Sequence, residues 1–283
     1  MVSPLEIRIF HFPDSACDGF PQINDPMSTL PTVLRVLTER LYMGQADGAE
    51  AKEWFTGPNR EPWMAKSGQD SLGDVAMPIH EAIVPWLYKI VDVTTNTVSL
   101  GSRPLGIPSA VSRGNLLLSF HRYRKGIKRQ EVDPSWRADS KFLEDYAVMS
   151  CIDRVVGQID RHNGNYMVLD DGTLFAVDNG RCMSNGFISN PLTEATLDDL
   201  KRTGCIEGHT WTTETPFVKQ RIAALTDDYV DAVFDAIPRL WRRLHDCEVA
   251  RNSTLMFQSA DLASKQNQVK INLTALRNWL AKQ

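Results

Sequence analysis

The sequence predicts an α+β chain folded as two lobes, the first rich in β-strands and the second mainly helical. Alternating runs of β-branched and aromatic residues recur up to residue 122, whereas apolar residues at helical spacing dominate after Pro134. Turns that contain glycine and proline separate the early runs. A chain of 283 residues is long enough for two small lobes. We place the first lobe at residues 1–122 and the second at residues 123–283.

The composition is that of an ordinary globular protein, with 42% hydrophobic and 23% charged residues. The formal net charge of −4 argues against nucleic acid or an anionic membrane as the main partner. No run approaches the ~18 apolar residues of a transmembrane segment, and no secretory signal is recognisable. The 5 cysteines are widely spaced without a CxxC motif, which is typical of reduced thiols. We therefore expect a cytoplasmic protein, and a bacterial protein delivered into a host cell would fit the same features.

The pattern of the first lobe predicts six strands and two helices. The expected strands are Leu5–Phe12, Leu41–Gly48, Ala49–Thr56, Trp63–Lys66, Val91–Leu100 and Ala110–Tyr123. A short helix is expected over Thr32–Leu41, and a second one opens at Pro78, with Pro85 shortening or kinking it. Gly44 and Gly48 lie in the second of these segments, where the strand enters a glycine-containing loop. Glycines in such a hairpin can lay backbone N–H groups over phosphates, although an ordinary hairpin turn would use the same residues.

Lys66 ends an apolar strand, and Glu81 lies in the first turn of the helix that follows. A lysine at this position commonly extends its ammonium to solvent, and a glutamate there is favoured by the helix dipole. The alternative is a phosphate-binding lysine that is held in place by an ion pair with the glutamate. The order of a lysine strand and then a glutamate helix favours this second interpretation.

In the second lobe, apolar residues at helical spacing predict a helix over Phe142–Gly157 that leads into a polar loop. Asp160 and Asn165 lie in that loop. The turn signal Asp170-Asp171-Gly172 then separates two short apolar runs, and Asp178 follows the second run. This pattern places Asp160, Asn165 and Asp178 at one mouth of a small hairpin. Two carboxylates and an amide there are suited to Mg²⁺ and a phosphate-bearing substrate.

The remaining chain predicts a long loop over Arg181–Thr215, which contains one short helix, and then three amphipathic helices. The short helix is expected over Leu192–Lys201, and the three later helices over Phe217–Ala224, Tyr229–Leu244 and Leu273–Lys282, with Pro238 interrupting the second of these three. A loop of that length in a compact domain is usually functional. The basic run Arg122–Arg129 is typical of a solvated surface, and it could also face an acidic substrate.

The order of these motifs resembles the protein-kinase-like fold. The closest resemblance is to the atypical branch that holds the phosphatidylinositol 3-/4-kinases and related bacterial kinases. Its catalytic loop reads Asp-Arg-His-x-x-Asn, which Asp160–Asn165 match in full. Type II phosphatidylinositol 4-kinases carry Asp-Asn-Gly in the metal motif, as residues 178–180 do here.

The resemblance implies ATP and Mg²⁺ as cofactors and a role for each motif residue. Asp160 would accept or orient the proton of the attacking hydroxyl, and Asn165 and Asp178 would hold Mg²⁺. Lys66 would contact the phosphates, Glu81 would hold Lys66, and Gly44 and Gly48 would cover the nucleotide. His162 would stabilise charge on the transferred phosphoryl group, or else pack under the hairpin. Arg161 is expected to brace the loop, and Asn179 could bond the loop backbone.

The sequence says less about the molecule that accepts the phosphate than about ATP, which donates it. The segment after the metal motif lacks Ala-Pro-Glu and carries only Arg181, Lys201 and Arg202 as fixed cations. Lipid kinases need cations there to hold an inositol phosphate head group. We therefore expect a Ser/Thr kinase that acts on a protein. A phosphoinositide kinase that binds a lipid head group, a small-molecule kinase, an AMP transferase and a non-catalytic nucleotide-binding module are the alternatives.

Overall fold

The computed structural model describes residues 41–46, 52–56, 62–66, 76–96, 98–102, 117–122, 127–128, 139–162, 164–184, 186–206, 211–246 and 259–283. The chain divides into two compact units. Unit 1 comprises Met1–Ala82, Thr97–Tyr123 and Asp235–Phe257, and unit 2 comprises Ile83–Asn96, Arg124–Phe234 and Gln258–Gln283. The two-lobed α+β architecture is confirmed, and the lobe boundary at residue 122 stays a prediction. The strand expected at Leu5–Phe12, the helix expected at Thr32–Leu41 and Gly48 lie outside the described residues.

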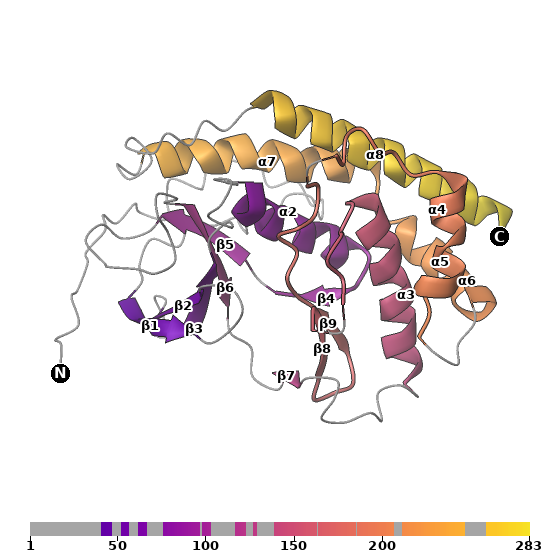
Figure 1. Ribbon diagram of the computed structural model, residues 1–283, viewed down its shortest axis with the longest axis horizontal. Helices are drawn as coiled ribbons and strands as arrows, with labels where there is room; N and C mark the ends of the chain where they lie inside the picture. The colour runs from indigo at the N-terminus through magenta and orange to yellow at the C-terminus, as the bar shows by residue number, and fades with distance from the viewer. Residues whose placement is uncertain are drawn as a thin grey trace, which may run out of the picture. The chain divides into compact units, whose positions relative to one another are not determined.

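Unit 1 contains a five-stranded antiparallel sheet in the order β1-β2-β3-β6-β5 (Figure 1). The strands are β1 Leu41–Ala46, β2 Lys52–Thr56, β3 Pro62–Lys66, β5 Val98–Ser102 and β6 Leu117–Arg122. Trp63 and Ala65 of β3 form a buried cluster with Leu118 and Phe120 of β6. Alternate side chains of a strand point to the same face of the sheet, so this cluster marks the core face. Lys66 is the last residue of β3 and lies opposite Ser119 of β6.

Helix α2 (Ala76–Ile90) is the helix that was expected to open at Pro78. It begins two residues earlier and continues past Pro85 to Ile90, so the proline does not shorten it. Every residue from Pro78 to Tyr88 is buried. A helix that is buried on all sides is stabilised by the surrounding core, which offsets the backbone hydrogen bond that a proline removes. The helix supplies both Glu81 and Tyr88 to the sites described below.

Unit 2 is built around helix α3 (Ser140–Val155) and a small mixed sheet in the order β4-β9-β8-β7. The strands are β4 Thr94–Thr95, β7 Ile127–Lys128, β8 Tyr166–Leu169 and β9 Leu174–Ala176. The Asp139 side chain caps α3 by accepting hydrogen bonds from the backbone N–H groups of Lys141 and Phe142, at 2.8 and 3.2 Å. A cap of this kind stabilises a helix by ~1 kcal/mol. Figure 1 shows β8 and β9 side by side next to α3.

The hairpin of β8 and β9 confirms the expected turn. The Leu169 N–H donates to the Thr173 carbonyl at 2.9 Å, and the Thr173 N–H donates to the Asp171 side chain at 3.0 Å. Gly172 has a φ of +84°, a conformation that glycine adopts without strain. The turn therefore fixes the strand register that brings the residues before β8 and after β9 together.

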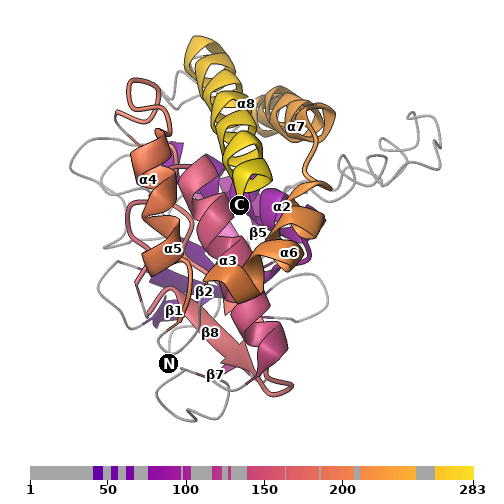
Figure 2. The same cartoon turned by 90° about the vertical axis from the view of Figure 1, so that its right-hand side faces the viewer.

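Five further helices follow the hairpin within the described residues: α4 Glu194–Asp198, α5 Leu200–Thr203, α6 Trp211–Ile222, α7 Asp227–Asp246 and α8 Ser259–Lys282. Figure 2 shows α5 and α6 on either side of α3, which both of them contact. Several expectations were wrong in detail. The strand expected over Val91–Leu100 is split into β4 and β5, which belong to different sheets, and the helix expected over Leu273–Lys282 begins at Ser259. The single helix expected over Leu192–Lys201 is the pair α4 and α5, and α7 continues through Pro238 without interruption, although the proline removes one backbone hydrogen bond. Among the described residues, no helix has the length and apolar character to cross a membrane.

Candidate active site

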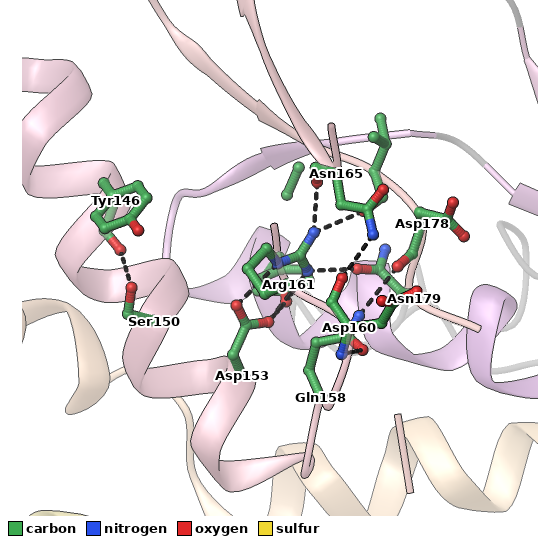
Figure 3. Close-up of polar contacts among 12 residues, drawn as sticks. Tyr146, Ser150, Asp153, Gln158, Asp160, Arg161, Asn165, Asp178 and Asn179 are labelled. Carbon is green, nitrogen blue, oxygen red and sulfur yellow. Dashed lines mark hydrogen bonds and ion pairs between the residues drawn. The ribbon is translucent and has the colours of Figure 1, made fainter. Parts of the chain in front are cut away.

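The open end of the β8–β9 hairpin brings two of the predicted site residues next to each other. Tyr166 pairs with Ala176, and one step further along the Val177 N–H donates to the Asn165 carbonyl at 3.1 Å. Asn165 and Asp178 therefore lie on adjacent strand extensions (Figure 3). Asp178 has a φ of +60°. This conformation costs a residue other than glycine ~1–3 kcal/mol and is found mostly at functional sites.

The orientation of the Asn165 side chain is set by Asp160, the third predicted residue of the site. The buried Asn165 amide donates from Nδ2 to the Asp160 carbonyl at 2.6 Å. Because a carbonyl oxygen can only accept, this bond fixes which end of the amide is nitrogen. The Asn165 Oδ1 atom is thereby left as an oxygen ligand, and it accepts no hydrogen bond from the described part of the chain.

Asp160 keeps its carboxylate accessible. The Asp160 side chain is 36% exposed, and its Oδ2 lies 3.6 Å from Nε of Arg181, which is itself 40% exposed. An ion pair between two such exposed groups is weak and readily exchanged for another partner. The carboxylate can therefore accept a hydrogen bond from an incoming hydroxyl group.

Arg161 lies at the centre of the site and holds the loop and the hairpin together (Figure 3). One guanidinium nitrogen, Nη1, donates to the carbonyl oxygens of Asn165 and Val177, at 2.5 and 2.7 Å. Asn165 is one of the two predicted metal ligands, and Val177 directly precedes the other, Asp178. The second terminal nitrogen, Nη2, donates to the Asn179 side chain at 3.0 Å. Asn179 therefore bonds the Arg161 side chain, and the bond to the loop backbone stays a prediction.

A buried carboxylate and a tyrosine hydroxyl hold Arg161 in this position. Asp153 of α3 accepts from Nε and Nη2 of Arg161 at 2.9 and 3.1 Å, in a bidentate pair. The Tyr88 hydroxyl of α2 accepts from Arg161 Nη2 at 2.9 Å and donates to Asp153. Burial lowers the pKa of Arg161, but Asp153 and Tyr88 more than reverse this and hold the pKa well above its ordinary value. Burial and the Asp153 charge raise the pKa of Tyr88 well above its ordinary value, so its hydroxyl stays protonated.

In unit 1, Lys66 and Glu81 form the ion pair that their order predicts. The Lys66 ammonium lies 3.2 Å from Glu81 Oε1, and both side chains are more than nine-tenths buried. A lysine whose ammonium extends to solvent is therefore excluded, and so is a glutamate held only by the helix dipole. Burying two charges is costly unless they are paired, which explains why the pair is held so closely.

The remaining predicted residues are placed less completely. Gly44 lies in β1 beside an irregularity in the pairing with β2, between Tyr42 and Gly44. His162 is exposed, and its Nδ1 accepts from the Gly164 N–H at 3.0 Å. The histidine is therefore not packed under the hairpin, and its imidazole is accessible from solvent.

Sequence reasoning missed Tyr88, Asp153 and Gln158. Asp153 interrupts the apolar face of a helix close to its end, and a polar residue there is the signal that could have identified it. Tyr88 lies 73 residues from Arg161, and no local pattern joins the two. Gln158 bonds both to Asp160 and to Asp178, yet it resembles an ordinary loop residue in the sequence.

Two comparisons with known proteins found a match. Residues 116–203 match the family model of phosphatidylinositol 3- and 4-kinase, a range that is less than half of the chain and includes the hairpin and every member of the Arg161 network except Tyr88. Among solved structures, the chain is similar to the crystal structure of a Helicobacter pylori proinflammatory kinase, CtkA. That match has a TM-score of 0.44 and 12% identity, and covers 85% of this chain and 94% of the other. No curated protein matches the chain.

Proposed function

We propose, from the premise that residues 116–203 are phosphatidylinositol 3- and 4-kinase-like, that this protein is an ATP- and Mg²⁺-dependent phosphotransferase. Within this proposal, the acceptor is Ser or Thr of a protein, and the enzyme works in the cytoplasm. The observation that carries the proposal is the arrangement of Asp160, Asn165 and Asp178 around the Arg161 network. A phosphotransferase needs positioning and charge neutralisation above all, and this arrangement can supply both.

The donor side of the reaction requires oxygen ligands and a fixed cation. The Asn165 amide oxygen and the Asp178 carboxylate are the two groups that would hold Mg²⁺, which binds proteins through one or two such ligands and completes its shell with phosphates and water. When bound, the ion would neutralise charge on the transferred phosphate. Lys66, held by Glu81 at 3.2 Å, would contribute a positive charge toward the phosphates.

The acceptor side uses the exposed carboxylate. Asp160 would accept the proton of the attacking hydroxyl or orient that hydroxyl for attack. The imidazole of His162 is accessible and lies two residues after Asp160 in the sequence. It would stabilise charge on the transferred phosphoryl group. Gly44 and Gly48 would cover the nucleotide with backbone N–H groups. These roles complete the proposed site.

A protein acceptor is favoured over an inositol phosphate by the charges after the metal motif. Of the three fixed cations there, Arg181 lies 3.6 Å from Asp160, Lys201 lies 3.4 Å from Asp198, and Arg202 lies 2.7 Å from Asp199. Each cation already has a carboxylate partner. These pairs are exposed and weak, so the small number of fixed cations in this segment, rather than their pairing, is what disfavours an inositol phosphate head group.

The experiment is an acceptor screen with γ-labelled ATP and Mg²⁺. Purified protein is incubated separately with mixed proteins, phosphoinositide vesicles and small alcohols, next to Asp160→Ala, Asp178→Ala and the exposed-site control Asp228→Ala. We expect label on protein with the wild type and with Asp228→Ala, and a loss of at least about 100-fold in both site variants. Label only on lipid or only on small alcohols would replace the protein acceptor by one of those classes. The absence of both transfer and ATP hydrolysis would reject the phosphotransferase.

A further inference from the structure

The side chain of Gln158 joins the backbones of two residues that the proposed reaction needs. Its Nε2 donates to the Asp178 carbonyl at 3.0 Å, and its Oε1 accepts from the Asp160 N–H at 3.1 Å (Figure 3). The Asp178 carbonyl can only accept and the Asp160 N–H can only donate. Only one orientation of the amide satisfies both, and turning the amide over would lose both bonds.

We propose that Gln158 is a positioning residue that sets the distance between Asp160 and Asp178. This inference rests on the proposed function, because it assigns Gln158 to the same site. A carboxamide is planar, and its oxygen and nitrogen diverge from a single carbon. The two backbone groups that it bonds are therefore held at a separation that the amide itself determines.

The backbone at Asp178 explains why such a tie is needed. Asp178 has a φ of +60°, a conformation that an aspartate keeps only when its surroundings hold it. Arg161 bonds the Val177 carbonyl on one side of this residue at 2.7 Å, and Gln158 bonds the carbonyl of Asp178 itself. The two contacts hold consecutive peptide groups and so fix the direction of the Asp178 side chain.

The same amide also holds the start of the catalytic loop. Ile159, between Gln158 and Asp160, is 71% exposed and packs too little to anchor this segment. The Asp160 carbonyl is bonded by Asn165, and its N–H is bonded by Gln158. The peptide groups on both sides of the Asp160 Cα are thus fixed, while the carboxylate stays accessible.

Two substitutions separate the two bonds. Gln158→Leu keeps the approximate size and removes both bonds. Gln158→Glu keeps an acceptor for the Asp160 N–H but, when ionised, cannot donate to the Asp178 carbonyl. Protonation of the introduced carboxyl restores a donor, so the defect of this variant is expected to shrink as pH falls toward the pKa of a glutamate, ~4.3 in model peptides and higher beside a carbonyl. Gln220→Leu, at an exposed position of α6, is the matched control.

The experiment measures three quantities in each variant: kcat for phosphate transfer from pH 8 to pH 5.5, the Kd for Mn²⁺ in the presence of ADP, and the exchange rate of the Asp160 amide hydrogen. For Gln158→Leu we expect roughly tenfold lower kcat, weaker Mn²⁺ binding and at least roughly tenfold faster exchange of that hydrogen. For Gln158→Glu, we expect wild-type exchange at Asp160 and a ratio of its kcat to that of the wild type that rises as pH falls.

The outcomes distinguish this inference from the proposed function. If the wild type transfers phosphate while both Gln158 variants behave like Gln220→Leu in all three measurements, the role of Gln158 is overturned and the function stands. A Gln158→Glu variant that exchanges the Asp160 amide hydrogen as fast as Gln158→Leu would also overturn it, since the retained acceptor would then not be what holds that N–H. If the wild type transfers no phosphate to any acceptor, the proposed function fails, and the Mn²⁺ affinities and the exchange of the Asp160 amide still decide whether Gln158 ties the two residues together.

Discussion

Replacing Arg161 by lysine tests the network that holds the site, because the positive charge is kept and the geometry of the donors is lost. The guanidinium bonds acceptor atoms in five residues, and the side chain is only 11% exposed. Its partners are both carboxylate oxygens of Asp153, the carbonyl oxygens of Asn165 and Val177, the side-chain oxygen of Asn179 and the hydroxyl of Tyr88. An ammonium has three N–H donors that radiate from one atom, so it cannot reproduce this spread.

The expected loss follows from counting acceptors. An ammonium can satisfy at most half of these acceptors, and water has little access to the rest. Each lost hydrogen bond in such a place costs about 1 kcal/mol, and more where the acceptor is left fully buried. We therefore expect Arg161→Lys to lower the free energy of unfolding by ~3 kcal/mol, a large part of the total for a domain of this kind.

Urea unfolding followed by circular dichroism measures this loss as a lower midpoint at an unchanged slope. Arg154→Lys is the matched control, since Arg154 also lies in unit 2 and pairs with Asp199 at 2.9 Å, but its side chain is 36% exposed. This control is expected to lose less than ~1 kcal/mol. Equal losses in the two variants would refute the view that the buried guanidinium network holds the site together.

Three further predictions concern other parts of the chain. Glu81→Gln leaves the buried Lys66 without its anionic partner, so we expect roughly tenfold lower kcat/KM for ATP and a lower urea midpoint. Burial raises the pKa of Tyr229 to about 12. The unfolded chain therefore releases this proton near pH 10, while the folded chain keeps it up to about pH 12. The free energy of unfolding falls as pH rises from 10 to 12 for this reason. Tyr229→Phe is expected to reduce this fall in alkaline urea titrations. Gly157→Ala is expected to cost ~2 kcal/mol in the same assay, because φ is +60° and the added Cβ would lie 2.5 Å from Phe187 Cδ2.

The local parts of the site could be predicted from the sequence. Asp160, Asn165 and Asp178 are separated by one loop and one tight turn, so turn chemistry and strand alternation are enough to bring them to one end of a hairpin. The Lys66–Glu81 pair could also be predicted, because a strand end and the first turns of the next helix are commonly neighbours. In both cases the sequence separation is short enough for secondary structure to determine the contact.

The support of the site could not be predicted, because it depends on contacts between distant elements. Tyr88, Asp153 and Arg161 come from α2, α3 and the loop, and only the packing of these elements brings them together. The effect of a proline on a helix is a second feature that could not be predicted from the local sequence. Both α2 and α7 continue through a proline, because packing along the rest of each helix can offset the one backbone hydrogen bond that is lost, and the local sequence does not specify that packing.

Asp160, Asn165 and Asp178 are proposed to transfer the terminal phosphate of ATP. Comparing ATP labelled at two different phosphates tests this transfer most directly. The wild type and Asp178→Ala are incubated with α-labelled and, separately, γ-labelled ATP in the presence of Mg²⁺ and the acceptor mixture. We expect that only the γ label reaches an acceptor, and that Asp178→Ala abolishes this transfer. Transfer of the α label would show an AMP transferase, and γ transfer that persists in Asp178→Ala would contradict the proposed site.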